Sequence, residues 1–151
     1  MSFFLINPYR FGSSGHYALV SMVSNISAHD YSTPEILSWD EEVYDYGGWY
    51  SAGSPTRLTA IATGIVRVSA FVGGSSVGAG NYRVTEILKN GSALSPKVKE
   101  SVYNVTEYGR GTFSYPISVT AGDYFQVQYT SNDTSTDVIA VKSWFAIETV
   151  E

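Results

Sequence analysis

Apolar and polar residues alternate over several short stretches of the chain, which is the pattern of β-strands that bury one face. The clearest stretch is GIVRVSAFVGG at 64–74, where valines and Ala70 recur at every second position and leave Arg67 and Ser69 on the other face. An early strand is expected within ALVSMVSNIS at 18–27, where the alternation is less regular. These stretches predict half-buried strands, each with one apolar face.

A hairpin is indicated by Asn90-Gly91, because this pair accepts the positive φ values of a tight two-residue turn. The strand that precedes it leaves two interpretations open. Val84 and Leu88 favour one buried face, and Ile87 favours the other.

A second turn, at 121–123, joins GTFSYPISV at 111–119 to DYFQVQYT at 123–130. Asp123 suits this turn, because a short carboxylate can accept backbone N–H groups within it. The strand that follows has two distinct faces. One face carries Phe125, Val127 and Tyr129, and the other carries Tyr124, Gln126, Gln128 and Thr130.

The chain closes with a polar loop, SNDTSTD at 131–137, and a last strand within VIAVKSWFAIETV at 138–150. Val141, Phe145 and Ile147 are expected on one face of that strand, and Lys142 and Trp144 on the other. Several short strands separated by turn signals predict one all-β domain, an antiparallel sandwich or jelly roll.

Composition and charge narrow the classes of function. The chain has 151 residues, 44% of them hydrophobic, which fits one domain with a real core. It has no cysteine, so disulfides and thiolate chemistry are excluded. The net charge is −5 and the nine Lys and Arg are scattered, which argues against nucleic acid and against an anionic membrane as partners.

Catalytic signals are weak. Ser14, His29 and Asp30 contain the residue types of a hydrolytic triad, but there is no nucleophile elbow, and His16 and His29 suit surface turns. GGSSVGAG at 73–80 opens no helix, so it is expected to connect strands and not to hold a phosphate. We therefore expect no enzyme activity and no cofactor.

Clustered carboxylates leave two interpretations open, a Ca²⁺ site or a solvated acidic loop. No EF-hand spacing is present, which favours the solvated loop, and paired carboxylates for glycoside hydrolysis are not specified by the sequence. The residues concerned are Asp40, Glu41, Glu42, Asp45, Asp133 and Asp137.

The order of these signals resembles the jelly-roll superfamily of tumour necrosis factor and complement globular heads, in the version common in bacteriophage structural proteins. The resemblance covers residues 18–151. Two positions depart from the pattern of the complement branch, Val66 in place of a tyrosine and Ala146 in place of a glycine. The matching segments are ILSWDEEVYDYGGWY, SPTRLTAIATGIVRVSAFV, ILKNG, ISVTAGDYFQVQYT and SWFAIETV.

The resemblance implies a homotrimer packed around an aromatic and aliphatic axis. Three Trp, twelve Tyr and seven Phe exceed the usual need of a core of this size, and interfaces favour Tyr and Trp. The alternative is a neutral, solvated sheet face. The candidate interface residues are Tyr124, Gln126, Tyr129, Trp144 and Phe145.

The stretch VYDYGGWY is a candidate surface for a receptor or glycan, because exposed aromatic rings stack on sugars and anchor protein partners. The residues are Tyr44, Tyr46, Trp49 and Tyr50. The alternative is that these rings pack in the core or between copies.

The opening FFLINPYRFG resembles the start of many tailed-phage virion proteins, so residues 1–17 are expected to form an attachment segment ahead of the jelly roll at 18–151. Its apolar run is too short for a signal peptide or a membrane span. The candidate attachment residues are Phe3, Phe4, Tyr9 and Phe11.

These expectations combine into a non-enzymatic virion protein, made in the host cytoplasm, that acts by assembly as a capsid decoration or head-fibre component. Its partners would be two further copies and a capsid or other virion protein. The alternatives are a tail-fibre tip, a carbohydrate-binding module that recognises a host glycan, or a cellular complement-like ligand.

Overall fold

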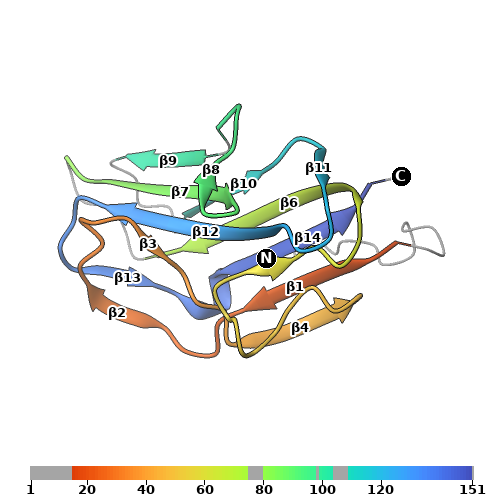
Figure 1. The fold of residues 1–151 in the computed structure, drawn as a ribbon. Coiled ribbons are helices and arrows are strands. Elements are labelled where there is room, and N and C mark those ends of the chain that lie inside the picture. Colours follow the sequence, from red (N-terminus) through yellow and green to blue (C-terminus); the bar gives the residue numbers. More distant parts are fainter. Residues whose placement is uncertain (1–14, 75–79, 98, 104–108, 151) are drawn as a thin grey trace.

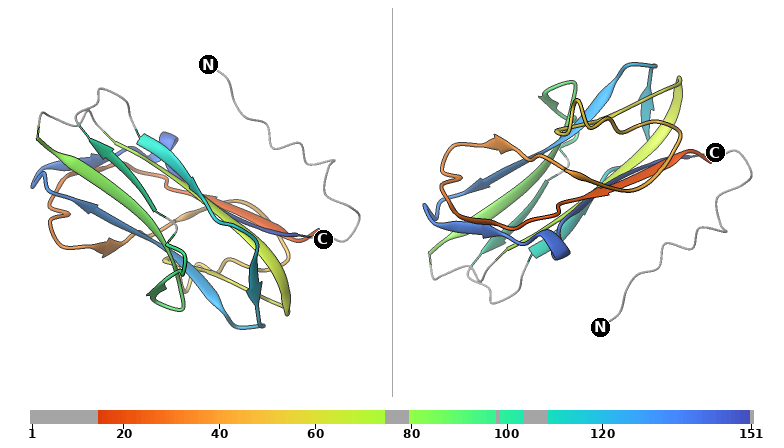
Figure 2. Two further views of the ribbon diagram at one scale, coloured as in Figure 1. Left: turned by 90° about the horizontal axis from the view of Figure 1, so that it is seen from above. Right: turned by 90° about the horizontal axis from the view of Figure 1, so that it is seen from below.

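The computed structural model describes residues 15–74, 80–97, 99–103 and 109–150, without the side chains of 99–103 and 109–110. Two antiparallel sheets lie face to face in this part of the chain (Figures 1 and 2). The first, the β6 sheet, has the order β10 (Gly109–Phe113), β6 (Gly64–Gly73), β14 (Trp144–Thr149), β1 (Tyr17–Ser21) and β4 (Glu41–Tyr46), and β11 (Ile117–Val119) also pairs with β6.

The second layer, the β12 sheet, is built around two long neighbouring strands. It has the order β3 (Glu35–Ile36), β12 (Tyr124–Ser131), β7 (Tyr82–Lys89) and β8 (Ser92–Ala93), with β5 (Leu58–Thr59) on β12 and β9 (Lys99–Tyr103) on β7. A small third sheet pairs β2 (Ile26–His29) with β13 (Thr136–Val138), and one 3-10 turn, η2 (Ala140–Lys142), precedes β14.

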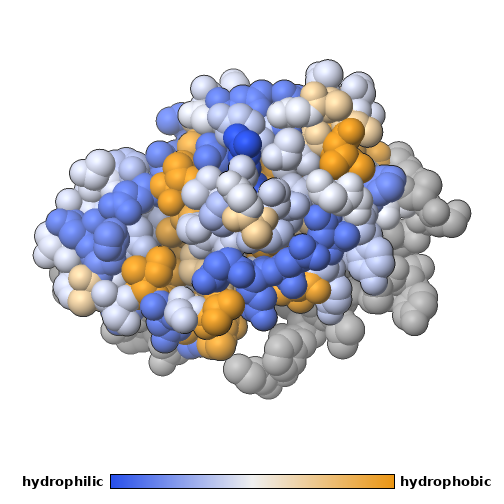
Figure 3. All heavy atoms as spheres, turned by 60° about the horizontal axis from the view of Figure 1, so that its bottom comes forward, coloured by the Kyte–Doolittle hydropathy of each residue, from blue (hydrophilic) through white to orange (hydrophobic). Residues whose placement is uncertain are grey.

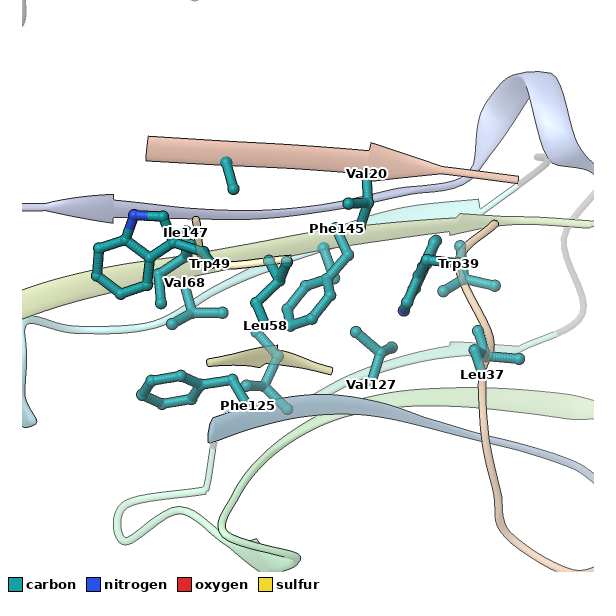
Figure 4. Packing of buried hydrophobic residues seen from close by; sticks show 14 of the residues in the cluster. Val20, Leu37, Trp39, Trp49, Leu58, Val68, Phe125, Val127, Phe145 and Ile147 are labelled. Atoms are coloured by element: carbon teal, nitrogen blue, oxygen red, sulfur yellow. The ribbon is translucent and has the colours of Figure 1, made fainter. Parts of the chain in front are cut away.

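The core fills the space between the two large sheets. Phe125 and Val127 of β12 point toward side chains of the β6 sheet, and Leu58 of β5 lies among them (Figure 4). Phe145 of β14 is buried against Trp39, with ring centroids 5.7 Å apart. Each side chain of this kind contributes about 1.5–3 kcal/mol when it is fully removed from water.

The alternation predicted for the two clearest strands is confirmed. Val66, Val68, Ala70 and Val72 of β6 are all buried. Along β12 every second residue from Phe125 is buried. The open question about β7 is also answered, because Ile87 lies on the buried face together with Arg83 and Thr85, while Leu88 is covered as well.

Two expectations differ from the structure near the chain ends. The early stretch forms two strands, and its buried residues are Ala18, Val20 and Met22, so Leu19 faces outward. The last stretch is not one strand, because Val138 ends β13 and η2 comes before β14. Val141 lies in η2 and is 91% exposed, because the 3-10 turn breaks the period of two that would have placed it beside Phe145.

Both predicted turns are present, and one set of polar side chains fastens them together. Asn90 and Gly91 have φ values of 51° and 75°, as a tight hairpin requires. The Asn90 Nδ2 donates to Asp123 Oδ1 at 2.8 Å, and the Tyr124 N–H donates to Asn90 Oδ1 at 2.9 Å. Asp123 Oδ2 accepts the Thr120 N–H at 2.8 Å within its own turn.

Lys89 completes this cluster, because its Nζ lies 2.8 Å from Asp123 Oδ2 and also donates to the Ser118 carbonyl at 2.9 Å. The Lys89 ammonium, followed by the Asn90 amide and the Thr120 N–H, holds the pKa of Asp123 far below its usual range. The ionised carboxylate of Asp123 therefore stabilises the fold, by a term that is present above about pH 4, where an unfolded aspartate is charged.

The variant Asp123→Asn should lower the free energy of unfolding by about 2 kcal/mol at pH 7, because it removes the charge from several hydrogen bonds. The folded-state pKa is depressed, so the wild-type advantage should shrink as the pH falls below about 4. Urea unfolding of both proteins between about pH 7 and pH 3 measures this difference. A difference that stays constant over that range would contradict the assigned role of the charge.

Val68→Ala and Val141→Ala delete the same atoms from a fully buried and a 91% exposed side chain. The first should cost about 2 kcal/mol in the free energy of unfolding, from lost burial and a cavity. The second should cost less than about 0.5 kcal/mol. Equal effects in urea unfolding would mean that β6 does not lie in the core as described.

Candidate assembly surface

The β6 sheet is apolar on its outward face as well as on its inward face. Strand pairing sets Leu19 of β1 beside Tyr44 of β4 and Ala146 of β14. Ala146 in turn pairs with Ser69 of β6, and Ser69 pairs with Phe113 of β10. These residues form one row across the sheet that carries no charged side chain, and its polar groups are the hydroxyls of Tyr44 and Ser69.

The next row carries the largest rings. Trp144 of β14 pairs with Phe71 of β6, which pairs with Gly111 of β10. A Cβ at Gly111 would lie 3.3 Å from the Phe113 ring and 3.6 Å from the Phe71 ring. The glycine therefore leaves room for both phenylalanine rings over β10. Phe113 is 65% exposed, which is unusual for a side chain of this size on a sheet.

On the other side of the first row, Tyr46, Tyr17, Glu148 and Arg67 follow one another across β4, β1, β14 and β6. The Tyr17 and Tyr46 ring centroids are 4.8 Å apart. Partial removal from water, and next the neighbouring Tyr46, raise the pKa of Tyr17. The three rows together are called the outward face below. Its apolar members are Tyr17, Leu19, Tyr44, Tyr46, Phe71, Phe113, Trp144 and Ala146.

Charge on this face is confined to few places among the described side chains. Arg67 Nη1 lies 3.4 Å from Glu148 Oε1, with the two side chains 46% and 28% exposed. Glu41, at the edge of the sheet on β4, accepts the Ser21 hydroxyl. The middle of the face is uncharged, and the ion pair has no net charge.

The YGGWY stretch is folded by Asp45, and not as an open recognition loop. Asp45 Oδ1 accepts the N–H groups of Gly48 at 2.9 Å and of Trp49 at 3.0 Å, and Oδ2 accepts the Tyr50 N–H at 3.0 Å. This turn sends Trp49 into the core, where it is buried. The Tyr50 hydroxyl donates to the Trp39 carbonyl at 2.7 Å.

The four residues predicted for a receptor or glycan surface are therefore separated. Tyr44 and Tyr46 lie on the outward face, Trp49 is in the core and Tyr50 is half-buried beside it. The physical reason is the sharp turn at Gly47 and Gly48, the latter with φ 76°, which reverses the direction of the chain between the pairs of rings.

The residues predicted for a trimer interface are also separated. Tyr124 and Gln126 lie on the outward side of the β12 sheet, where Arg57 sits 5.0 Å from the Tyr124 ring centroid. Trp144 lies on the outward face of the opposite sheet. Tyr129 and Phe145 belong to the core, because the period of two along β12 and β14 turns them inward.

Tyr129 shows how deep this core burial is. Its ring meets the Tyr31 ring edge-on, with centroids 4.9 Å apart. Burial raises the pKa of Tyr31 to about 12 and raises that of Tyr129 further. A phenol in this position has no surface to offer to a second copy.

The described side chains form no catalytic constellation. His29 Nε2 contacts Glu35 Oε2 at 3.0 Å, and Asp30 Oδ1 accepts the Ser32 N–H at 2.8 Å, so neither completes a triad. The hydrogen bond from the Ser32 N–H favours the ionised carboxylate and is the main cause of the lowered pKa of Asp30. Ser14 lies outside the described residues.

Within the described ranges no three His, Asp or Glu residues come close enough to hold a metal ion. In the acidic cluster, Asp40 Oδ1 accepts the Val23 N–H at 2.8 Å. Asp45 accepts three backbone N–H groups, and Glu41 accepts the Ser21 hydroxyl. No helix among the described residues is long and apolar enough to cross a membrane. The predicted attachment residues Phe3, Phe4, Tyr9 and Phe11 lie outside the described residues.

Comparison of the chain with protein-family models and with curated proteins gives no match. Among solved structures, murine APRIL at pH 5.0 is similar with a TM-score of 0.60 and 12% identity, over 90% of this chain and 99% of that chain. Murine APRIL at pH 8.0 has a TM-score of 0.57 and 14% identity over the same shares. The fold is a tumour necrosis factor-like jelly roll.

This jelly roll confirms the predicted fold class, an all-β antiparallel sandwich. At 12% and 14% identity the likeness concerns the fold alone. Sequence reasoning missed Tyr17, Leu19, Phe71 and Phe113 as members of the outward face. The sequence did contain a signal for two of them. Leu19 and Phe71 are large apolar residues that alternate with the core-facing residues of their strands, so they had to lie on the outward side.

Proposed function

We propose that this jelly roll is a non-enzymatic, self-associating protein that forms a homotrimer through the outward face of the β6 sheet. The observation that carries the proposal is the continuous row Tyr44, Leu19, Ala146, Ser69 and Phe113, which crosses five strands without a charge. Covering such a face with another copy removes apolar surface from water, which is the main driving force of association.

The distribution of charge supports this choice of face. The chain has a net charge of −5, so two copies repel each other through their like net charges. The middle of the outward face carries no charge among the described side chains, and its one ion pair is neutral overall. Contact through this face therefore brings the least repulsion.

The edge of the β6 sheet argues against open-ended assembly. β4 is one of the two edge strands of this sheet, and it carries Glu41, Glu42 and Asp45. Charged side chains on an edge strand oppose the addition of further strands. Figure 3, in which the lower edge of Figure 1 is turned forward, shows apolar side chains in separate patches among hydrophilic ones. A closed trimer through a sheet face fits these features better than a fibre built through an edge.

The role we propose for the trimer is that of a virion structural protein, made in the host cytoplasm, which decorates a capsid or forms part of a head fibre. Support comes from the resemblance of FFLINPYRFG at 3–12 to the start of tailed-phage virion proteins, and from the lack of a catalytic constellation among the described side chains. Attachment to the particle would use the segment that contains Phe3, Phe4, Tyr9 and Phe11.

Recognition of a host glycan has less support from the described residues. Trp49, the largest ring of the predicted recognition stretch, is buried, and Tyr44 and Tyr46 belong to the face that the proposed trimer covers. The trimer and the glycan surface would compete for these tyrosines.

The purified full chain should have a mass near three times 16.5 kDa in sedimentation-velocity and light-scattering measurements. Phe113→Glu should shift it toward monomer, because it places a charge from each copy in the interface, and the 65% exposure of Phe113 means that the monomer still folds. Val84→Glu, on the outward side of the β12 sheet, is the control and should remain trimeric.

A wild-type protein that stays monomeric up to about 100 µM would refute self-association, since stable oligomers form well below that concentration. Dissociation by Val84→Glu with no effect of Phe113→Glu would move the interface to the other sheet.

The virion role predicts that antibodies raised against the purified trimer label particles from the culture that carries the gene. Immunogold electron microscopy should place the label on the capsid at symmetry-related positions. The matched control is the same serum absorbed with the purified protein. Label confined to the tail tip would replace the capsid role with the tail-fibre alternative, and washed particles without label would refute the virion role.

A further inference from the structure

We propose that the Arg67–Glu148 ion pair determines the orientation in which copies of the chain meet on the outward face. This inference rests on the proposed self-association and adds to it a specificity-determining pair. It concerns residues that no sequence signal singled out as interface residues.

Among the described side chains, the row next to the pair carries no charge. Arg67 of β6 and Glu148 of β14 are register partners, and Glu148 is also the register partner of Tyr17 on β1. The adjacent row holds Leu19, Ala146 and Ser69. Any copy that covers Leu19 and Tyr17 therefore also comes against the ion pair.

In the single chain the pair is held loosely. The separation of 3.4 Å is long for a charged hydrogen bond, and the side chains are 46% and 28% exposed. Water can solvate both groups, so the pair adds little to the stability of one chain. Its contribution changes when another copy excludes that water.

When another copy buries the pair, the free energy of association depends on whether the two charges stay together. Two desolvated charges that remain paired cost little in net terms, whereas one desolvated charge without its partner is strongly unfavourable. A copy docked in a wrong orientation would separate or half-cover the pair with apolar rings such as Tyr46 or Phe113. Only docking orientations that keep Arg67 and Glu148 together avoid this cost. The pair therefore favours those orientations, whereas the apolar residues of the face would accept many.

The charge of the pair also favours arrangements that keep Arg67 and Glu148 together in the trimer. Each copy brings one positive and one negative group in this ion pair, so the pair itself adds no net charge to the interface. A lone Glu148 in each copy would bring like charges together in a chain that already has a net charge of −5.

The test compares three variants of the full chain in sedimentation-velocity runs over a concentration series. Glu148→Gln leaves Arg67 unpaired and should raise the concentration at half-dissociation by about tenfold or more. The charge-swapped double variant R67E/E148R restores a pair with reversed order and should recover at least most of the wild-type assembly. Glu35→Gln is the matched control, because it breaks the His29–Glu35 pair, which is similarly exposed at 43% and 45% but lies away from the face.

Thermal unfolding of each variant shows whether the chain is folded, and the double variant keeps the inference testable if Glu148→Gln unfolds. A weaker trimer for Glu148→Gln, recovery in the double variant and no change for Glu35→Gln would support the proposal. Wild-type trimers with no effect of Glu148→Gln, or with no recovery in a folded double variant, would overturn it and leave self-association intact. A monomeric wild type would overturn self-association itself.

Discussion

A two-layer sandwich has one interior, yet the β6 sheet carries apolar residues on both of its faces. In β1, Ala18 and Val20 enter the core while Leu19 and Tyr17 point away from it, and in β14 Phe145 and Ile147 enter the core while Trp144 points away. Among the described residues, the other large sheet covers only one of these faces. The hydrophobic effect therefore favours covering the outward face, and this is the constraint on which the proposed self-association depends.

The rigidity of the outward face depends on contacts elsewhere in the fold. Its strands come from both ends of the chain, since β1 pairs with β14, and the Thr149 N–H donates to the His16 carbonyl at 2.9 Å beside them. On the facing layer, Asp123 and Asn90 fix the turns that lead into and out of β12 and β7. Because the two layers share one core, fixing these turns also fixes the surface against which the β6 sheet packs (Figure 4).

The sequence pattern predicted the parts of the fold that depend on neighbouring residues. The alternation from Val66 to Val72 and the hairpin at Asn90 are local features, and both are present. The pairing of Tyr17 with Glu148 joins residues that are far apart in the chain, so no local pattern contains it. The fold class came from the order of several signals, and the likeness to APRIL confirms it.

The candidate site was harder to predict, because alternation shows that a strand has two faces but not which face meets the core. Tyr129 and Phe145 are apolar in composition and suit an interface as well as a core, and only the packed sandwich shows that they turn inward. Trp49 differs for another reason. Its direction is set by Asp45, whose carboxylate accepts three successive N–H groups, and this turn is recognisable only once the chain is folded.

The Asp45 turn also links the core to the outward face. By fixing the backbone after β4 it places Trp49 inside and leaves Tyr44 and Tyr46 on the sheet, beside Leu19 and Tyr17. The β12 sheet contrasts with this arrangement, because its outward side carries the amides of Gln126 and Gln128, which water can satisfy. The outward side of β12 is therefore more polar than the row of Leu19, Ala146 and Phe113 on the β6 sheet. This difference is the physical basis of the proposed association through the β6 sheet, and it does not depend on the identity of any particle or receptor.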